Sequence, residues 1–556
     1  MNQVNKRHLA TRGLLFAVAL VLVYLFRPLF HPIFYDMIYS PGAFIFWTIT
    51  LLSVTFLWFL PPFDVTDSRT SSALAELSED TDKDQMNSSA VVKLSLVGIV
   101  VIVALIIAGV YAVPANEFEE RTLAQQTMNE GEAIESFPEM NADNARIAPK
   151  PVADTQTRGS VSYRQYRLGT SDIARMPDGR LAWSYPIQPD GTRNMLFENQ
   201  QGVLLSDMTS MEDREISAFD DTSFEIGEGM LLHRNSEWNL RKSDFWAKYQ
   251  DDAIEFVHDG KPYMAYPKTG HEWHLTPIPH TTPTWEGVAL LHPDGTIDQL
   301  SPEEAQESEI LDGQRLYPLY NAERKMSSLG YREGIINQLG TIGSHKEEVE
   351  IADLPSGAGN QQPFVIDLEG EQMSYVTALE PYGADTRGLD EVWFINSRTG
   401  QPTFFESNKQ TLLGPERAMG LVRSEDSRTG WGDNFFVVEP IPVIVDDELW
   451  WHSKVVPTDN TDITRNVFVN SETEEAIALT STETVEQFLA GETVDPNETV
   501  ETEPSEDENI DYYIVIQDDD GTVIERIPVK PGEDPSVNFV SSDEIKAGEQ
   551  NETSTG

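Results

Sequence analysis

Three apolar runs near the N-terminus constrain the fold of this chain more than any other feature. They span residues 14–26, 43–60 and 94–113. A helix that crosses the hydrocarbon core of a bilayer needs about 20 apolar residues, a length that the second and third runs reach. The first run reaches it by extension upstream through Leu9, with the Arg12 side chain extending to the membrane surface, or downstream past Arg27 and Pro28. The sequence therefore predicts an N-terminal three-helix transmembrane anchor in residues 1–113, with helices at about 10–27, 42–60 and 91–113.

A cleavable signal peptide is the alternative interpretation of the first run. Lys6, Arg7 and Arg12 form the positively charged segment that such a peptide needs. No small-x-small cleavage site follows the apolar run, so an uncleaved anchor is favoured.

The basic residues in the short flanks predict the orientation of the anchor. Lys6, Arg7 and Arg12 precede the first helix, Arg27 alone follows it, and Arg69, Lys83 and Lys93 lie between the second and the third. These positions predict a cytoplasmic N-terminus and a cytoplasmic loop at 61–90. An odd number of crossings then leaves the chain after Val113 outside the cell. The alternative is the inverted topology, with the large acidic part in the cytosol.

Charge and composition restrict the possible partners and chemistry. The chain carries 92 acidic and 39 basic residues, a net charge of −53 at pH 7. Such a chain repels polyanions, so no nucleic acid is expected as a partner. The sequence contains no cysteine, which excludes thiol catalysis, disulfide bonds and cysteine-ligated metal sites.

The acidic excess is consistent with either disorder or adaptation to salt. Disorder would leave the acidic stretches without aromatic residues, yet 391–395 (EVWFI) and 449–451 (LWW) lie within them. We therefore expect most of the acidic region to fold with its carboxylates on the surface. In molar salt the Debye length falls to about 3 Å and their repulsion fades. Few lysines, an acidic surface and no cysteine are typical of a haloarchaeal protein; an acidic secreted protein is the alternative.

The pattern changes after the third apolar run. Residues 114–145 are rich in helix formers and lack a sustained apolar face, which predicts a solvated helical stalk. From residue 146 onward, short strand-like segments are separated by turns such as Pro-Asp-Gly. The predicted fold class is α+β: the anchor carries an extracytoplasmic, β-rich domain of antiparallel hairpin units at 146–340 and 341–490.

The last part of the chain is predicted to contain a linker and a hairpin. Residues 491–509 are acidic and without aromatics, which predicts a disordered linker. Within 510–556, two strand-like runs flank the Asp-Asp-Asp-Gly sequence at 518–521, which predicts a hairpin followed by a tail. A lone hairpin is marginal in water, so we expect it to dock on its own chain or on a partner.

Four segments share one arrangement, in which an aromatic strand accompanies a strand–turn–strand unit: 181–206, 261–298, 392–405 and 449–480. Three of them precede acidic, helix-like segments. This unit, above all NSRTGQPTFF from Asn396 and NSETEEAIAL from Asn470, resembles the PepSY domains of exported and membrane-anchored proteins. The resemblance covers scattered fragments and implies a non-catalytic domain that binds or inhibits other proteins. Generic α+β hairpins without kinship are the alternative.

The sequence lacks the motifs of the common enzyme classes. It contains no G-x-x-x-x-G-K-[ST], no G-x-G-x-x-G after a strand, and no G-x-S-x-G. The carboxylates are so abundant that no acid/base pair can be singled out. We therefore predict no enzymatic activity, no catalytic residue and no cofactor from these motifs.

Histidine is the remaining candidate for metal chemistry, because five of the ten histidines fall within 35 residues: His258, His271, His274, His280 and His292. Neutral imidazoles bind zinc or copper, and His271, His274 and His280 are the candidate ligands. In a strand, however, His271 and His274 would face opposite sides of the sheet. Ordinary loop histidines are therefore the alternative.

Asn497 and Asn551 each begin an Asn-x-Thr sequence on the predicted exterior side. They are candidate glycosylation sites, with chance occurrence as the alternative.

Together these features predict a multi-pass protein of the cell membrane whose C-terminal domain is extracellular. Its expected partners are the lipid bilayer and proteins in the membrane or at the surface. The predicted function is that of a non-enzymatic surface protein of a halophilic archaeon, or of a virus or vesicle derived from one, in assembly, adhesion or sensing. The alternatives are an accessory subunit of a membrane transport or secretion complex and a metal-dependent surface hydrolase.

Overall fold

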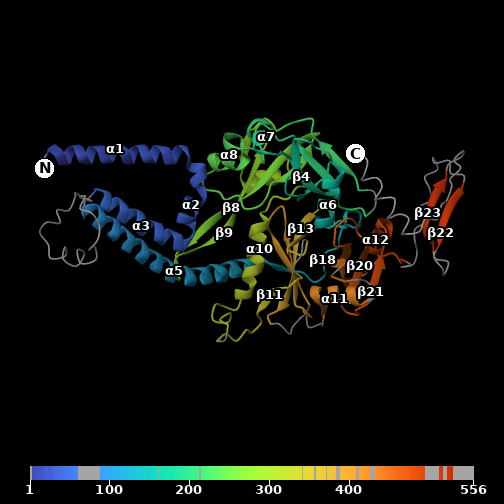
Figure 1. Ribbon diagram of the computed structural model, residues 1–556. Coiled ribbons are helices and arrows are strands. Elements are labelled where there is room, and N and C mark those ends of the chain that lie inside the picture. The colour runs from blue at the N-terminus through green and yellow to red at the C-terminus, as the bar shows by residue number, and fades with distance from the viewer. Residues whose placement is uncertain are drawn as a thin grey trace, which may run out of the picture. The chain divides into compact units, whose positions relative to one another are not determined.

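The chain is described by a computed structural model (Figure 1). It covers residues 3–59, 88–161, 163–211, 214–340, 342–355, 359–370, 372–383, 388–407, 412–425, 431–432, 434–494, 512–517 and 523–529. The chain divides into two compact units, Met1–Asn497 and Glu498–Gly556, which are taken separately.

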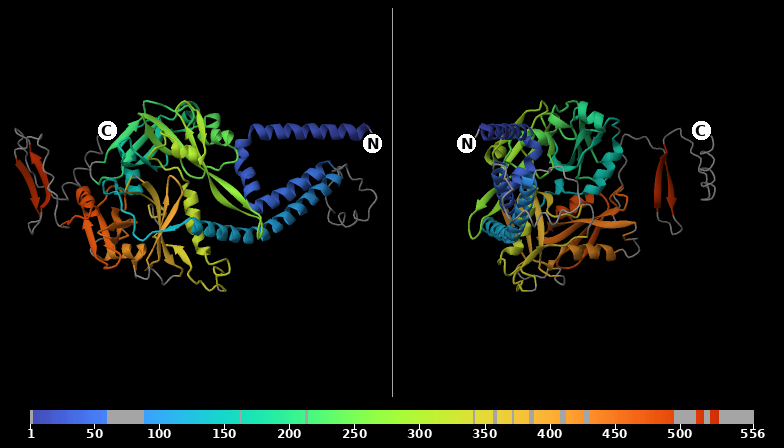
Figure 2. Two further views of the ribbon diagram at one scale, coloured as in Figure 1. Left: turned by 180° about the vertical axis from the view of Figure 1, so that it is seen from behind. Right: turned by 60° about the vertical axis from the view of Figure 1, so that its left-hand side comes forward.

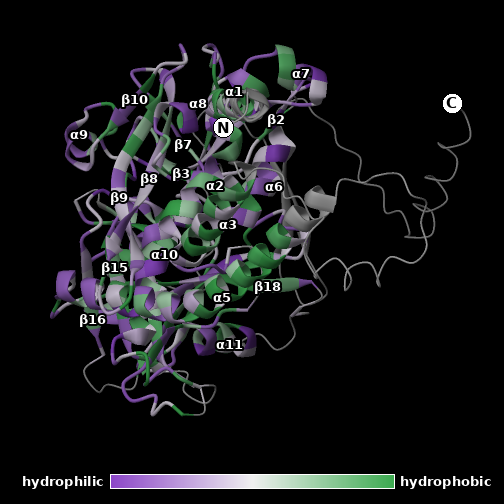
Figure 3. Ribbon diagram, turned by 90° about the vertical axis from the view of Figure 1, so that its left-hand side faces the viewer, coloured by the Kyte–Doolittle hydropathy of each residue, from purple (hydrophilic) through white to green (hydrophobic). Residues whose placement is uncertain are grey.

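The first unit begins with four helices: α1 (Gln3–Leu25), α2 (Arg27–Tyr39), α3 (Pro41–Phe59) and α5 (Ser88–Glu130). Their apolar stretches include α3 and the first half of α5, which are green in Figure 3. Among the described residues, one helix is long and apolar enough to cross a membrane, Ser95–Glu130 within α5. Thr11–Leu25 and α2 pass the same test together but are bent by 96°, and Pro41–Leu57 within α3 is shorter. The structure thus contains one or two candidate spans, and the predicted three-helix anchor is not shown.

Two helix boundaries differ from the predicted ones. The chain bends at Phe26 and continues as α2, in which Pro28 occupies the first turn, where its missing N–H costs nothing. The predicted third helix and the first part of the predicted stalk form one helix, which passes through Pro114 and ends at Glu130. The rest of 114–145 holds strand β1 (Glu132–Ala133) and a short 3-10 turn instead.

Two antiparallel sheets follow, between residues 166 and 300 (Figure 1). The first has the order β2-β4-β5-β6 with β3 beside β4: β2 (Tyr166–Leu168), β3 (Asp172–Arg175), β4 (Leu181–Pro189), β5 (Val203–Asp207) and β6 (Ile216–Phe219). The second has the order β10-β9-β8-β7: β7 (Ile254–His258), β8 (Lys261–His274), β9 (His280–Leu291) and β10 (Ile297–Leu300). Strands β8 and β9 are the longest of this pair of sheets and form a protruding hairpin.

Two further sheets lie later in the sequence. One has the order β1-β16-β15-β13-β11 with β12 beside β13: β11 (Val349–Ile351), β12 (Phe364–Leu368), β13 (Gln372–Pro381), β15 (Glu391–Asn396) and β16 (Pro402–Glu406). The other runs β18-β19-β20-β21: β18 (Phe435–Val445), β19 (Glu448–Pro457), β20 (Arg465–Asn470) and β21 (Ala476–Leu479). Strand β1 pairs in parallel with β16, so the segment directly after α5 is held in a sheet.

Short elements complete the first unit. Strands β14 (Gly388–Leu389) and β17 (Leu412–Leu413) pair with each other. The helices are α6 (Lys150–Ser160), α7 (Thr192–Phe197), α8 (Ser236–Ser243), α9 (Pro302–Glu307), α10 (Leu319–Ser328), α11 (Pro415–Glu425) and α12 (Thr482–Leu489). Helices combined with mostly antiparallel sheets confirm the predicted α+β class.

The largest hydrophobic cluster of the unit draws on three of the sheets. It contains Trp183 and Tyr185 of β4, Trp393 of β15 and Trp451 of β19, all of them buried. Residues from both predicted ranges, 146–340 and 341–490, therefore share one core. The aromatic residues within the acidic sequence pack inside the fold, as expected.

Two turns of the predicted repeat have the same hydrogen bonds. The side-chain oxygen of Asn396 accepts from the backbone N–H groups of Arg398 and Thr399, at 2.9 and 3.0 Å. The side-chain oxygen of Asn470 accepts from the N–H groups of Glu472 and Thr473, both at 2.9 Å. The repeated Asn-Ser sequence thus corresponds to a repeated turn.

In the second unit, the described residues form an antiparallel hairpin of β22 (Tyr512–Gln517) and β23 (Val523–Val529). The strands agree with the predicted hairpin within 510–556. Most of the predicted loop 61–90, most of the predicted linker 491–509, and the candidate glycosylation sites Asn497 and Asn551 lie outside the described residues, while 88–90 of the loop belong to α5.

Candidate functional site

The β8–β9 hairpin, which holds the three predicted metal ligands, packs against the N-terminal helices (Figures 1 and 2). His271 of β8 lies against α2: its Nδ1 is 2.8 Å from the hydroxyl of Tyr35, and its ring stacks on Tyr39. Burial, together with the charges of Lys248 and Arg324, lowers the pKa of His271 to about 4. The ring is therefore neutral at physiological pH and serves as a contact between hairpin and helix.

His274 and His280 lie opposite each other near the end of the hairpin and stack with their ring centres 5.2 Å apart. Nδ1 of His280 is 2.7 Å from the carbonyl oxygen of Ile278, which can only accept, so this nitrogen carries the hydrogen. Burial lowers the pKa of His280. In the neutral ring Nε2 then accepts from the hydroxyl of Thr122 in α5, at 2.7 Å. Nε2 of His274 lies 2.8 Å from Thr282.

The structure thus brings His274 and His280 together and places His271 against a different helix. Within the part of the chain that the structure describes, no three His, Asp or Glu side chains are arranged to hold a metal ion. His258 and His292, the other members of the sequence cluster, lie near Asp259 and Asp298. In the described structure His271 joins the hairpin to α2, and His280 joins it to α5.

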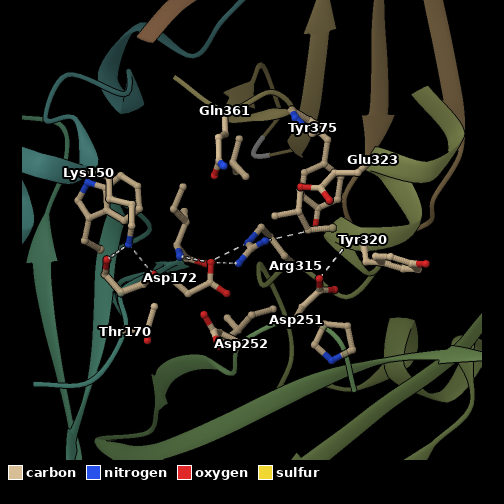
Figure 4. Close-up of a pocket in the computed structure, with 18 of the residues that line it drawn as sticks. Lys150, Thr170, Asp172, Asp251, Asp252, Arg315, Tyr320, Glu323, Gln361 and Tyr375 are labelled. Atoms are coloured by element: carbon tan, nitrogen blue, oxygen red, sulfur yellow. Dashed lines mark hydrogen bonds and ion pairs between the residues drawn. The ribbon is translucent and has the colours of Figure 1, made fainter. Parts of the chain in front are cut away.

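A polar cleft of about 410 Å³ lies among β3, β12, β13 and α10 (Figure 4). Arg315 forms its centre: Nε donates to the carbonyl oxygen of Ile173 at 3.0 Å, one NH₂ group donates to the hydroxyl of Tyr375 at 3.2 Å, and the other pairs with Asp172. Arg315 is only 2% exposed. Its guanidinium therefore holds the two sides of the cleft together.

Asp251 stands beside this pair at the start of α10. Its Oδ1 accepts from the backbone N–H of Tyr320 at 3.1 Å and so caps the helix, while its Oδ2 is buried and has no hydrogen-bond partner among the described residues. Burial, and to a lesser extent the negative charge of Asp172, raises the pKa of Asp251 to about 7. Asp252 and Glu323 lie at the exposed rim. Arg146 and Lys150 also line the cleft, but among the described residues none of Asp251, Asp252 and Glu323 forms an ion pair, an arrangement able to bind a positively charged group.

A buried ion cluster lies next to the cleft. Arg146 forms two hydrogen bonds with the carboxylate of Glu439, at 2.7 and 2.9 Å. Nζ of Lys454 is 3.9 Å from the same carboxylate, and both side chains are fully enclosed. Burial lowers the pKa of Lys454 to about 7. Glu439 sits at the irregular point of the β18–β19 pairing, with φ at +52°. This bulge brings its carboxylate to Arg146.

Sequence reasoning missed both the cleft and the ion cluster. Arg315 and Asp172 are 143 residues apart, and Asp251 and Tyr320 are 69 apart. No local spacing links such residues, and in a chain with 92 acidic residues no single carboxylate is conspicuous. One signal for Arg315 was present in the sequence. Cations are scarce in this chain, and an arginine followed by apolar residues, as in Gln314-Arg315-Leu316-Tyr317, predicts a buried side chain with a buried partner.

Neither a comparison with models of protein families nor a comparison with curated proteins finds a match for this chain. The likeness to PepSY domains therefore stays a prediction, and the functional argument depends on the geometry described above.

Proposed function

We propose that the protein is a non-enzymatic, membrane-anchored surface protein that holds its α+β part outside the cell for assembly, adhesion or sensing. The observation that carries this proposal is the continuity of α5. Its first half is apolar and largely exposed, and its second half is bound into the folded part without a break in the helix.

Several contacts fix the second half of α5. Arg324 of α10 pairs with Glu119 and Glu120 of α5, at 2.9 and 2.7 Å. Lys325 pairs with Glu130 at 2.6 Å. Exposed ion pairs stabilise little individually, but these three tie two helices together along three turns. A folded part attached in this way is held at a fixed place above the apolar segment, which suits display and assembly better than a flexible tether would.

The three-helix anchor with an outward-facing C-terminal part belongs to this proposal. Helices α3 and α5 pack along each other, and α1 supplies a third apolar helix. The basic flanks of the sequence support a cytoplasmic N-terminus. The halophilic origin is supported by the net charge of −53 and the absence of cysteine.

Because the chain has no cysteine, single cysteines can test the topology directly. Glu309→Cys, at an exposed position after α9, should react with a membrane-impermeant maleimide on intact cells. Ser72→Cys, in the predicted cytoplasmic loop, should react only after lysis. The reverse pattern would exclude a surface role, and release of the protein by alkaline carbonate would exclude the anchor.

The accessory-subunit alternative predicts a stable partner in the membrane. Purification of the full chain in detergent and molar salt distinguishes the two. A membrane protein retained in fixed stoichiometry would favour the accessory subunit, and a chain without partners, or associated only with itself, favours display.

The cleft around Asp251 favours sensing among the surface roles, because its carboxylates suit a small ligand with a positive group. Putrescine should then raise the melting temperature of the protein, while succinate at equal ionic strength should not. Asp251→Asn keeps the oxygen that caps α10 and removes the charge, so it should weaken the response to putrescine. Equal responses in the variant and the unchanged chain would rule the cleft out as the ligand site.

A further inference from the structure

Helix α2 has two different faces, and only one of them is covered by protein. Pro28, His31 and Tyr35 are buried against the folded part, where Nε2 of His31 lies 3.0 Å from the carbonyl oxygen of Ala247. Leu29, Phe30 and Ile33 on the remaining surface are 63, 37 and 46% exposed, and Asp36 near the end of this surface is ion-paired with Lys248 at 3.6 Å. An apolar face of this kind on a helix directly joined to α1 needs a covering partner.

Two other exposed apolar side chains, Trp246 and Leu275, belong to segments that contact α2, α3 or α5. Trp246 is 50% exposed, and its neighbour Phe245 packs on His31 of α2. Leu275 is 72% exposed at the end of the β8–β9 hairpin. That end contacts the apolar helices: Trp273 packs on Phe44 of α3, and Tyr111 of α5 donates to the carbonyl oxygen of Pro279 at 2.6 Å. The two segments therefore lie next to the apolar helices.

The direction and length of α2 agree with a position along a membrane surface. It is bent by 96° from the helix before it and has 13 residues, about 20 Å of helix, whereas the hydrocarbon core is about 30 Å thick. Figure 1 shows α2 leaving the end of α1 at a steep angle, between α1 and the sheet that contains β8.

The charges beside α2 favour lipid as the partner over the acidic surface of another copy or of a similar protein. Arg27 binds the carbonyl oxygen of Lys242 at 3.0 Å, and Lys242 is exposed. Neither has an ion pair among the described residues, although the chain has 92 acidic side chains. Cations and aromatic rings beside an apolar face are the composition of segments that lie at the lipid–water boundary.

We propose that α2 lies in the boundary layer of the bilayer, and that Leu29, Phe30 and Ile33, together with Trp246 and Leu275, contact the lipid. These five side chains form the lipid-contact surface. The folded part then rests on the membrane through this surface rather than standing clear of it on a stalk. The inference rests on the proposed anchoring and adds the position of the folded part relative to the lipid.

Spin labels on single cysteines test this position. The full chain would carry one label at Ile33 or Leu275, with Leu20 in α1 and Phe197 in α7 as references, in vesicles of equal parts phosphatidylcholine and phosphatidylglycerol. Leu20 is 54% exposed on an apolar helix and Phe197 is 73% exposed far along the chain. Collision with oxygen reports lipid, and collision with a water-soluble nickel chelate reports water.

The Leu20 label should favour oxygen and the Phe197 label the nickel chelate. Labels at Ile33 and Leu275 should be intermediate, with oxygen access at least twofold above that at Phe197. If the labels at Ile33 and Leu275 have the same reagent access as the Phe197 label while the Leu20 label is in lipid, the lipid-contact surface is wrong and the anchor stands. The same conclusion follows if the labels at Ile33 and Leu275 are shielded from both reagents. A Leu20 label that behaves like Phe197 would overturn the anchor itself. Phe30→Cys gives a second position on α2 if Ile33→Cys lowers the melting temperature.

Discussion

The carboxylate of Glu255 is buried within the fold near the carboxylate of Glu228. It is 1% exposed, and its one side-chain partner is the hydroxyl of Ser184, which donates to Oε2 at 2.7 Å. Burial raises the pKa of Glu255 well above its usual value, and the charge of Glu228 raises it further. Burial likewise raises the pKa of Glu228 to about 7.

The variant Glu255→Gln keeps the acceptor for Ser184 and removes the charge. The folded state binds the proton of Glu255 more tightly than the unfolded state, so the charge costs nothing at pH 4 and costs more as the pH rises above about 4.5. We expect the variant to raise the free energy of unfolding at pH 8 by about 1 kcal/mol, a typical size for a single substitution, and to leave it unchanged at pH 4. Urea unfolding at the two pH values measures this. Glu135→Gln on the surface is the control, and an equal gain at both pH values would contradict the assignment.

Lys454 has the opposite pH dependence. Its pKa is about 7 in the folded state, because it is fully buried, and the unfolded state binds the proton more tightly. The cost of burying the ammonium is therefore complete below pH 7 and declines as the pH rises toward 10. We expect Lys454→Met to stabilise the protein most below pH 7 and progressively less above it.

Glu439→Gln serves as the contrasting variant. It leaves Arg146 buried without its carboxylate, so it should lower the free energy of unfolding by about 3 kcal/mol or more. Denaturant titrations at pH 6 and pH 9 compare the two changes. A loss of stability on removing Lys454 at pH 6 would show that its amine is a needed partner of Glu439.

At the scale of elements, α3 and α5 approach closely at Gly42. A Cβ placed at Gly42 would lie 2.8 Å from Cβ of Ala112 and 3.4 Å from the carbonyl oxygen of Ala108. Small residues at such a crossing allow two helices to pack in lipid.

Gly42→Val should therefore separate the two helices and destabilise the protein by about 1–3 kcal/mol, the usual cost of overpacking. Gly109→Val on α5 is the matched control, because a Cβ at Gly109 meets nothing within 4 Å. Thermal unfolding in detergent micelles compares the variants. Similar melting temperatures would mean that the contact at Gly42 yields without cost.

The same helices show what sequence patterns predict at this scale. Apolar runs and helix formers place α3 and the start of α5 to within a few residues, because both signals are local. The bend at Phe26 and the course of α2 depend on Tyr35, whose partner His271 lies 236 residues away. The five clustered histidines were visible in the sequence, but the contacts of His271 with α2 and of His280 with α5 depend on which helices the hairpin meets.

For the whole molecule, the net charge of −53 is the dominant property. Few of the carboxylates of the described residues are buried. The mutual repulsion of those on the surface acts over about 10 Å in 0.1 M salt and about 3 Å in 1 M salt. We expect the melting temperature to rise steadily in KCl between 0.1 and 2 M, and equally in NaCl. Sucrose at matched osmolality should produce a smaller rise, and an absence of salt dependence would contradict a salt-adapted surface.

For the molecule as a whole, the sequence predicts the fold class but not the core or the cleft. The α+β class follows from alternating strands, turns and short helices, and it is confirmed. The shared core is different: Trp183, Trp393 and Trp451 come from distant segments, and only the fold shows that they belong to one cluster. The cleft depends on the same long-range assembly, so no pattern of neighbouring residues indicates it.

Helix α10 connects two places that the chain keeps far apart. Arg324 and Lys325 clamp it to α5, and its first turn, capped by Asp251, forms a wall of the cleft. Helix α5 continues from its apolar half through Pro114 to this clamp as one helix. Under the proposed anchoring, a bilayer that tilts the apolar half of α5 would therefore shift one wall of the cleft, and a ligand that shifts this wall would change the tilt of the apolar half.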